Sequence, residues 1–363
     1  MSASAPSSPP ALEARLTRAW LSRGPLACAL WPLSLLFRAL SGVRAALYRA
    51  GVLKAGRLPV PVVVVGNIFI GGTGKTPLTI WLVQALQAAG MRPGVISRGH
   101  GSKDTAPRLV DAAATPSLVG DEPLLIWQRC GCPVMVGRDR AATGQALLAL
   151  HPELDIILTD DGLQHYALQR DVEIILFDGR GAGNGWLLPA GPLREPVSRR
   201  RDFTVINAPQ LTPDLLAGVG AGRSASLADT FQMTLAGEFA EQLCDRQQRR
   251  SLAALAAEQA ARPTLRVVAA AGIGNPGRFF AMLTAAGLRV QELPLPDHHD
   301  FLDRPFAALD ADLILMTEKD AVKCAQIEEL RDDPRLWVVP VTARIDAALA
   351  AHIVEKCRGR TFA

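Results

Sequence analysis

Hydrophobic residues along the chain occur in short continuous runs, separated by stretches in which they recur at helical spacing. Residues 60–65 are valine except for one proline, and such a β-branched run predicts a strand buried on both faces. Residues 66–75 are rich in glycine, and residues 77–89 have the spacing of a helix. A strand, a glycine loop and a helix in this order indicate the start of an α/β nucleotide-binding unit.

Similar apolar runs recur along the chain and predict a mostly parallel, doubly wound sheet followed by a smaller α/β unit. The first set of strands is expected at 94–97, 133–136, 155–159, 173–177 and 203–207. The second set is expected at 265–270, 289–293, 313–317 and 336–340. Residues 211–229 are rich in loop formers, so we expect an N-terminal segment over 1–55, a P-loop domain over 56–220 and a smaller domain over 221–363.

The N-terminal segment combines an apolar stretch with basic residues. Residues 24–37 carry no charge, but these 14 residues are fewer than the ~20 that a membrane span needs, and Pro25 and Pro32 interrupt them. The next residues have helical spacing, with one apolar face: Leu36, Leu40, Val43 and Leu47.

Arg38 and Arg49 lie nearly opposite that apolar face, and Arg44 lies at its border. This arrangement predicts a helix that lies in a membrane interface. The alternative is an ordinary amphipathic helix packed on its own domain.

Composition and charge narrow the classes of function. With 363 residues, 49% of them hydrophobic and 20% charged, the chain is a folded protein of more than one domain rather than a disordered one. Residues 1–60 hold eight Lys and Arg but one acid, which indicates an anionic surface or a phosphorylated ligand. Aromatic residues make up 5% and the net charge is +4, so a nucleic-acid partner is not expected. The six scattered cysteines are typical of reduced thiols.

The most specific motif is the glycine loop that ends in Lys75 and Thr76. Its backbone N–H groups and the following helix N-terminus bind phosphates, Lys75 reaches the β/γ-phosphates, and Thr76 can ligate Mg²⁺. Phe69 occupies the position where the usual spacing has its first glycine, so this is a variant P-loop. The predicted nucleotide-binding residues are Phe69, Ile70, Gly71, Gly72, Thr73, Gly74, Lys75 and Thr76.

Acidic residues at the end of the strand at 155–159 indicate a metal site. In P-loop enzymes an acid at such a strand end helps to hold Mg²⁺, and here Asp160 and Asp161 are available. Gln164 and His165 follow closely, but direct binding of Mg²⁺ by His165 is disfavoured because Mg²⁺ prefers oxygen ligands.

Three further motifs carry polar side chains but little specificity alone. Asp121 and Glu122 open a helical stretch and could simply cap it. The cluster at 297–300 (D-H-H-D) is either a surface loop or a metal site, and residues 187–196 form a proline-rich loop that presents Arg194.

Together these motifs resemble the tetraacyldisaccharide 4′-kinases of lipid A biosynthesis over residues 20–323. The resemblance rests on V-P-V-V-V-V-G-N with G-G-T-G-K-T-P, S-R-G-H-G, G-D-E-P, D-D-G-L-Q-H, L-L-P-A-G-P-L-R-E-P, P-D-H-H-D-F and T-E-K-D-A-V-K, in the family's order. His100 and Leu163 depart from the family's usual Tyr and Phe. Neither supplies a reacting group, so the departures affect only local packing or substrate contacts.

The resemblance implies transfer of the γ-phosphate of ATP to the 4′-hydroxyl of a tetraacyldisaccharide 1-phosphate, giving lipid IVA, with Mg²⁺ as cofactor. Lys75 would hold the phosphates, and Thr76 with Asp160 the metal. Asp121 would take the acceptor proton, oriented by whichever of His298 and His299 faces the site, with His298 expected. Arg194 would neutralise transition-state charge. The residues expected to shape the acceptor and metal environment are Asp161, Glu122, Gln164 and His165.

The same resemblance implies a lipid A disaccharide precursor as partner and no obligate protein partner. It places the enzyme on the cytoplasmic face of the inner membrane of a Gram-negative bacterium, as a peripheral or monotopic protein. The first rival is a membrane-positioned switch ATPase of the MinD/ParA type, but such proteins carry a lysine where this chain has Ile70. A DHH-type phosphoesterase would lack the P-loop, and a non-enzymatic membrane adaptor would leave it unexplained.

Overall fold

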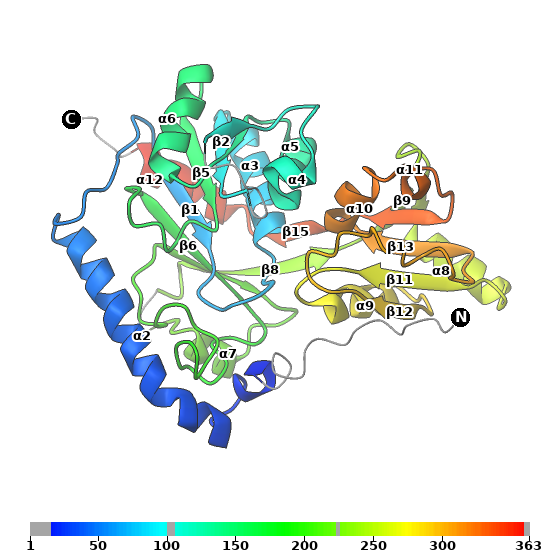
Figure 1. Ribbon diagram of the computed structural model, residues 1–363, viewed down its shortest axis with the longest axis horizontal. Helices are drawn as coiled ribbons and strands as arrows, with labels where there is room; N and C mark the ends of the chain where they lie inside the picture. The colour runs from blue at the N-terminus through cyan, green and yellow to red at the C-terminus, as the bar shows by residue number, and fades with distance from the viewer. Residues whose placement is uncertain (1–15, 100–105, 223–225, 359–363) are drawn as a thin grey trace.

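Two β-sheets organise the computed structural model, which describes residues 16–99, 106–222 and 226–358 (Figure 1). The larger sheet has nine strands in the order β15-β8-β7-β6-β1-β5-β2-β4-β3, and the smaller has six in the order β10-β9-β14-β13-β11-β12. We call each sheet with its helices a lobe. Most neighbouring strands are parallel, which confirms the predicted α/β class.

The strands of the first lobe surround β1, which leads into the glycine loop. They are β1 (Val62–Gly66), β2 (Pro93–Ser97), β3 (Arg108–Leu109), β4 (Val134–Val136), β5 (Ile156–Asp160), β6 (Val172–Asp178), β7 (Phe203–Asn207), β8 (Thr230–Ala236) and β15 (Thr342–Ile345). Val63 and Val65 face one hydrophobic core while Val62 and Val64 face another. Burial on both faces is the reason why β1 needs an apolar residue at each position.

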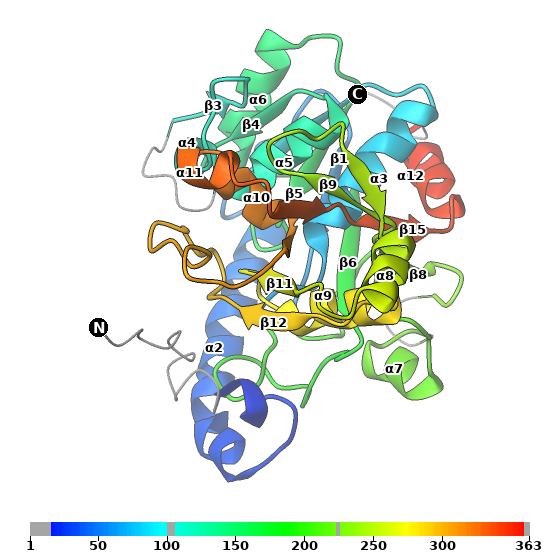
Figure 2. The same cartoon turned by 90° about the vertical axis from the view of Figure 1, so that its right-hand side faces the viewer.

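Helices cover both faces of the larger sheet (Figure 2). The hydrophobic core that contains Val63 is completed by three helices: α3 (Lys75–Ala88), α5 (Asp121–Cys130) and α12 (Ala348–Arg358). The core that contains Val62 is completed by α6 (Arg140–Leu150). The remaining helices of this lobe are α2 (Pro25–Arg49), α4 (Pro116–Val119) and α7 (Pro213–Gly218).

The second lobe is a smaller sheet with its own two cores. Its strands are β9 (Phe239–Gln242), β10 (Arg249–Ser251), β11 (Val267–Ala271), β12 (Gln291–Pro294), β13 (Leu313–Thr317) and β14 (Leu336–Val339). Its helices are α8 (Leu252–Ala261), α9 (Pro276–Ala285), α10 (Glu318–Cys324) and α11 (Glu328–Arg331). The central strand β11 is buried at every position, as the apolar run at 265–270 predicted.

Sheet membership does not follow the predicted division at residue 220. Strands β8 and β15 lie within 221–363 but pair with the larger sheet, and α12 packs there through Leu349 and Ile353. The chain therefore passes between the lobes twice, from β8 to β9 and from β14 to β15. The extent of each independently folding domain stays a prediction.

Helix α2 differs from its prediction, because Pro32 does not interrupt it. The helix runs continuously for 25 residues along the outside of the first lobe (Figure 1). Proline removes one backbone hydrogen bond from a helix, and here packing on the lobe holds the helix together: Ala27 and Ser34 are buried against it. Among the described residues, α2 is the helix long and apolar enough to cross a membrane by length and composition.

Candidate functional site

The glycine loop between β1 and α3 has the backbone of a phosphate-binding loop. Gly71 and Gly74 have φ angles of 99° and 101°, which favour glycine. A Cβ on Gly74 would lie 2.6 Å from Asn207 Nδ2, which donates a hydrogen bond to the Thr73 carbonyl at 2.9 Å. Asn207, the last residue of β7, thus holds the loop by this hydrogen bond. The loop ends at the N-terminus of α3, whose free N–H groups attract anions.

The side chain of Lys75 points to a polar group at the ends of β1 and β5. Its Nζ donates to Asn67 Oδ1 at 3.3 Å and lies 4.0 Å from Asp161 Oδ1. Arg194 joins the same group, because its Nη2 donates to the Asn67 carbonyl at 2.6 Å and to Asp161 Oδ1 at 2.9 Å. Sequence reasoning assigned no role to Asn67, although it follows the valine run within the recognised motif.

The two carboxylates at the end of β5 have different environments. Asp160 is 1% exposed, and burial, followed by the negative charges of Glu122 and Asp161, raises its pKa to about 7. Burial would also raise the pKa of Asp161, but the charges of Lys75 and Arg194 outweigh it and lower this pKa.

This pair of carboxylates fits a divalent cation. The pKa of Asp160 is raised first by burial and then by the charges of Glu122 and Asp161, whereas Lys75 and Arg140 lower it, so ionised Asp160 would gain from a further positive charge. Among the described residues, no three His, Cys, Asp or Glu side chains are placed to hold a metal ion by themselves. Mg²⁺ in nucleotide sites is bound by one or two carboxylates plus phosphate oxygens, so the chemistry of the predicted ligands Asp160 and Thr76 is compatible with this ion.

Gln164 and His165 lie beside this group and are fixed by their neighbours. Gln164 Nε2 donates to Glu195 Oε1 at 2.9 Å, and Glu195 is buried. The pKa of His165 is lowered to about 4, by burial and then by Arg140 and Arg98, so its ring is neutral near pH 7. Sequence reasoning missed Glu195, although it follows Arg194 directly.

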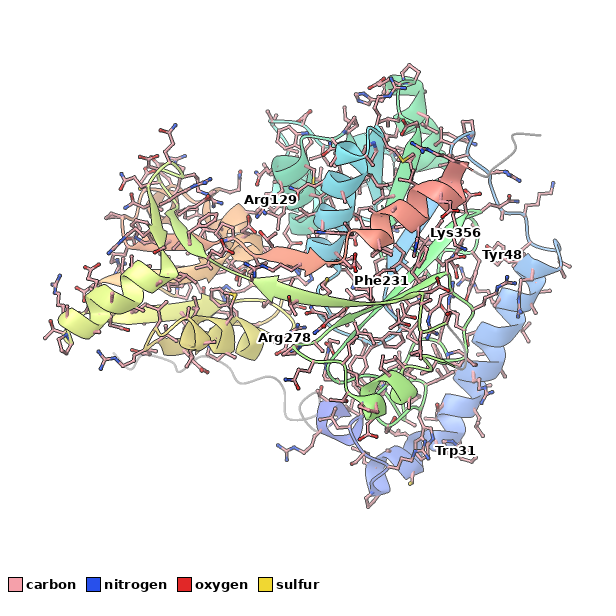
Figure 3. The ribbon with its side chains drawn as sticks, turned by 180° about the vertical axis from the view of Figure 1, so that it is seen from behind. Trp31, Tyr48, Arg129, Phe231, Arg278 and Lys356 are labelled. Carbon is pink, nitrogen blue, oxygen red and sulfur yellow. The ribbon has the colours of Figure 1, made fainter. Side chains whose placement is uncertain are left out.

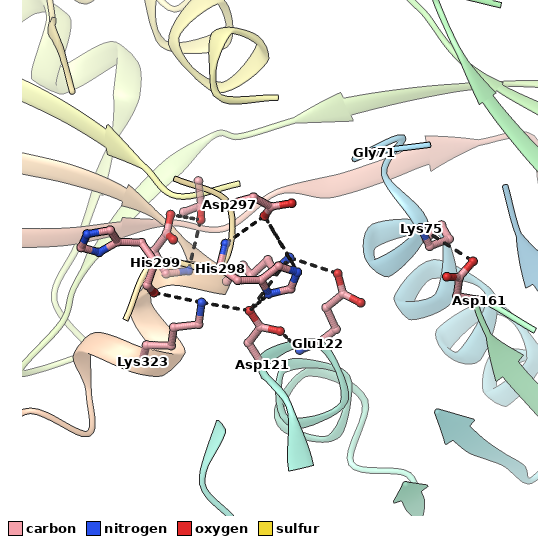
Figure 4. Close-up of polar contacts among 12 residues, drawn as sticks. Gly71, Lys75, Asp121, Glu122, Asp161, Asp297, His298, His299 and Lys323 are labelled. Carbon is pink, nitrogen blue, oxygen red and sulfur yellow. Dashed lines mark hydrogen bonds and ion pairs between the residues drawn. The ribbon is translucent and has the colours of Figure 1, made fainter. Parts of the chain in front are cut away.

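The predicted contact between Asp121 and the second lobe is present, and it is made by His298. His298 Nδ1 lies 3.1 Å from Asp121 Oδ2 (Figure 4). His299 has another role, because its Nδ1 accepts the backbone N–H of Phe301 at 3.0 Å and its Nε2 lies 3.4 Å from Asp303.

Two lysines of α10 complete this cluster. Lys323 Nζ lies 3.2 Å from Asp121 Oδ2, and Lys319 Nζ lies 3.2 Å from Glu122 Oε1 and 3.4 Å from His298 Nε2. Both lysines lie in the T-E-K-D-A-V-K motif, to which the sequence analysis gave no chemical role. The motif therefore brings positive charge to the start of α5.

These charges determine the protonation of the pair. Burial would raise the pKa of Asp121, but the hydrogen bond from His298 and the charges of Lys319 and Lys323 outweigh it and hold this pKa well below its usual range. The hydrogen bond to Asp121 in turn raises the pKa of His298. Asp121 is consequently an ionised carboxylate, able to accept a hydrogen bond from a hydroxyl.

The predicted residues thus form two groups, which Figure 4 shows on either side of the site. One group contains Lys75 and Asp161, and the other contains Asp121 and His298. The lobes touch where a Cβ on Gly274 would lie 2.9 Å from the backbone nitrogen of Gly72. Arg129 Nη1 of α5 also donates to Glu318 Oε1 of α10 at 2.5 Å.

The first residues of the glycine loop are held on the side away from α3. Phe69 is buried, with the Arg180 guanidinium 4.3 Å from its ring centroid. The Ile70 N–H donates to the Pro192 carbonyl at 3.0 Å. Both residues therefore anchor the loop, and their predicted contact with nucleotide stays a prediction.

Comparison with known proteins places this geometry in context. Residues 26–358 match the family model described as LpxK, tetraacyldisaccharide-1-P 4′-kinase. The chain is 60% identical over 357 residues to the tetraacyldisaccharide 4′-kinase of Janthinobacterium sp. (strain Marseille), covering 97% of this chain and 98% of that protein. It is 45% identical to the protein of the same name from Dechloromonas aromatica, covering 96% of this chain and 98% of that protein.

A solved structure is also similar. The crystal structure of LpxK from Aquifex aeolicus in complex with ATP superimposes with a TM-score of 0.71 at 27% sequence identity. The match covers 92% of this chain and 99% of that one.

Proposed function

The chain belongs to the tetraacyldisaccharide-1-P 4′-kinase family, and from that premise we propose which of its residues carry the reaction. The protein transfers the γ-phosphate of ATP to the 4′-hydroxyl of tetraacyldisaccharide 1-phosphate and forms lipid IVA in lipid A biosynthesis. The observation that carries the assignment of residues is the division of the site into a phosphate-binding loop and the Asp121–His298 pair on opposite sides.

The nucleotide is held by residues 69–76, with Lys75 on the β- and γ-phosphates. Phosphoryl transfer depends mainly on positioning and on neutralising charge, and a P-loop lysine supplies both. Thr76 and Asp160 would hold Mg²⁺, which would offset the negative charge of the phosphates when bound. Arg194 lies beside Asp161, where it is available to neutralise charge that develops in the transition state.

Asp121 acts on the acceptor hydroxyl. Its carboxylate is ionised, and His298 and Lys323 hold Oδ2 in one position. A loose transition state requires little early removal of the proton, so a carboxylate of low basicity is adequate as general base. Glu122 beside Asp121, and Gln164 and His165 beside Asp161, shape the acceptor and metal environment, and His298 orients Asp121 only when the lobes are closed.

Helix α2 supports an association with the surface of the inner membrane. Its inner face is covered by the first lobe at every third or fourth residue: Ala27, Leu30, Ser34, Phe37, Ser41, Ala45 and Tyr48. A second stripe is apolar and exposed: Leu26, Leu33, Leu36, Leu40, Val43 and Leu47. Because one face is already packed on protein, we infer that α2 lies in the interface with this stripe in the lipid rather than crossing it.

This orientation gives the enzyme access to an acceptor that has acyl chains. The relatives named above are bacterial proteins, and we propose the cytoplasmic face of a Gram-negative inner membrane, where ATP is available. We also propose that it needs neither a nucleic acid nor an obligate protein partner. We propose residues 1–55 for the membrane, 56–220 for nucleotide and, within 221–363, the second lobe for closure.

Assaying phosphorylation of the lipid acceptor with ATP and Mg²⁺ tests the assignment. Lys75→Ala is expected to lower kcat at least about 10²-fold, as loss of one charge-stabilising contact typically does. The matched control is Lys356→Ala, because Lys356 is a half-exposed lysine of α12 that pairs with Asp202. Lys75→Ala activity within about tenfold of Lys356→Ala would refute the nucleotide site. Consumption of ATP without a phosphorylated lipid would refute the acceptor.

A further inference from the structure

Residues 184–196 lie between α2 and the glycine loop, and we call them the arginine loop because they carry Arg194. Toward the glycine loop, the Arg194 N–H donates to the Ile68 carbonyl at 2.7 Å, and the Pro192 carbonyl accepts the Ile70 N–H. These hydrogen bonds tie the arginine loop to the chain directly before the phosphate-binding glycines.

The other side of the arginine loop is held by the N-terminal segment. Ser34 of α2 is buried, and its Oγ donates to the Leu187 carbonyl at 2.8 Å. Trp20 Nε1, just before α2, donates to the Pro189 carbonyl at 3.0 Å. Trp31 and Trp186 also pack together, with ring centroids 6.3 Å apart. The loop is therefore bonded on one side to the helix and on the other to the phosphate site.

A second connection starts near the other end of α2 (Figure 3). Arg44 Nη1 donates to the Gln164 carbonyl at 3.2 Å, and the Arg44 guanidinium lies 5.7 Å from the ring centroids of both Tyr48 and Tyr166. The Tyr166 hydroxyl then donates to Glu195 Oε2 at 2.6 Å. Glu195, the neighbour of Arg194, is thus reached from α2 through Tyr166.

We infer that α2 is a positioning element for the phosphoryl-transfer site, acting through Ser34 and Arg44 on the arginine loop and on Tyr166. Arg44, Ser34 and Tyr166 are accordingly positioning residues. The inference rests on the proposed function, because it assumes that Arg194 acts on the transferred phosphoryl group and that α2 binds a membrane.

The physical basis is the continuity of these contacts. Through Ser34 and Arg44, α2 makes hydrogen bonds to the Leu187 and Gln164 carbonyls and a cation–π contact with Tyr166, while the adjacent stripe is exposed to the interface. A helix seated in lipid has less freedom to move, so the arginine loop that it holds is restrained as well. Small misplacements of charged groups lower the rate of the chemical step more than they lower affinity for substrate. The inference therefore predicts effects on kcat, separate from effects on membrane binding.

Two arginines of α2 provide the decisive comparison. Arg44→Gln and Arg38→Gln each remove one positive charge from the same helix, but the Arg38 side chain makes no polar contact with another described residue. Vesicle binding and lipid phosphorylation are measured on vesicles containing anionic phospholipid and the acceptor, at saturating ATP and saturating vesicle concentration. Measuring kcat at a saturating vesicle concentration separates the chemical step from the effect of each lost charge on membrane binding.

We expect a kcat at least about fivefold lower for Arg44→Gln than for Arg38→Gln, the effect of one net hydrogen bond of ~1 kcal/mol. Tyr166→Phe keeps the ring and loses the bond to Glu195, so it is expected to lower kcat while vesicle affinity is retained. The control for Ser34→Ala is Ser41→Ala, because the Ser41 hydroxyl donates a hydrogen bond within α2 at 2.8 Å. Only Ser34→Ala is expected to lower kcat.

Equal kcat values within both pairs, Arg44 with Arg38 and Ser34 with Ser41, would overturn the inference and leave α2 as a membrane anchor.

Failure of the proposed function is distinguishable from failure of this inference, because the unaltered protein would then not phosphorylate the acceptor at all. If the unaltered protein is active but does not bind vesicles, the membrane assignment fails, and the kcat comparison is made in detergent micelles. A misfolded variant is recognised by a lowered Tm, and Tyr48→Phe, which keeps the ring stacked on Tyr166, is expected to retain the parent kcat.

Discussion

The imidazole Nδ1 of His298 lies 3.1 Å from the carboxylate Oδ2 of Asp121, although 177 positions separate the two residues in the sequence. Asp121 is almost fully buried at the start of α5, and His298 has a φ angle of 59° in the loop after β12. A left-handed conformation is unfavourable for a residue with a side chain. The backbone N–H of His298 donates to the Gly272 carbonyl at 3.2 Å within the second lobe, and its ring meets Asp121 of the first lobe, so the pair depends on how the two lobes are placed.

Asp121 and His298 are expected to act as one unit in the reaction. Asp121→Ala and His298→Ala should each lower kcat by about 10²–10⁴-fold, the usual contribution of general-base assistance. The double variant should be little slower than the slower single variant, because both changes remove the same assistance. Steady-state kinetics at saturating ATP and acceptor checks this. Losses that multiply would show independent roles.

The pair should also make stability depend on pH. The folded-state pKa of His298 is raised above its ordinary value of about 6.5, through its hydrogen bond to Asp121. Its stabilising contribution is therefore complete below that value and is lost as pH rises through the folded-state pKa. The Tm difference between the parent and His298→Ala should shrink between pH 6 and pH 9. The other charged groups facing His298 are Lys319 and Asp297. A constant difference would contradict the ion pair.

Closure of the lobes should depend on the absence of a side chain at Gly274. A Cβ there would lie 2.9 Å from the Gly72 nitrogen and 3.2 Å from Asp297 Oδ2, so Gly274→Ala cannot form this contact without a shift of backbone. We expect KM for ATP to rise and kcat to fall, with Tm nearly unchanged. Gly277→Ala is the control, because the nearest atom to its Cβ lies at 3.8 Å. Equal kinetics for the two variants would contradict closure over the glycine loop.

The exposed stripe of α2 should determine binding to membranes. Leu40 is 64% exposed in the middle of this stripe, and Leu40→Asp would place a charge in the lipid interface. Leu150→Asp is the control, since Leu150 is 60% exposed at the end of α6. In flotation with vesicles that contain anionic lipid, only Leu40→Asp is expected to lose the vesicle fraction. Equal flotation of the two variants would mean that α2 merely packs on the first lobe.

Local features of the sequence were sufficient for the central strands and for the glycine loop. Strand β7 and strand β13 have the predicted bounds, because a strand buried on both faces is mostly apolar along its length. The strands that were missed, β3, β8, β9, β10 and β15, are short, exposed in part or at a sheet edge. The residues of such strands need to be apolar on one face only or not at all, so the hydrophobic pattern that would predict these strands is weak.

The sequence by itself determined the fold class and the chemistry that the P-loop and the strand-end acids can perform, because backbone preference and phosphate binding depend on neighbours along the chain. Only the tertiary structure decided which lobe receives β8 and β15, that His298 rather than His299 meets Asp121, and that Lys319 and Lys323 surround the pair. It also decided that α2 holds the arginine loop through Ser34. These contacts join distant parts of the chain, and their geometry follows from how whole helices and sheets pack, which a local pattern does not encode.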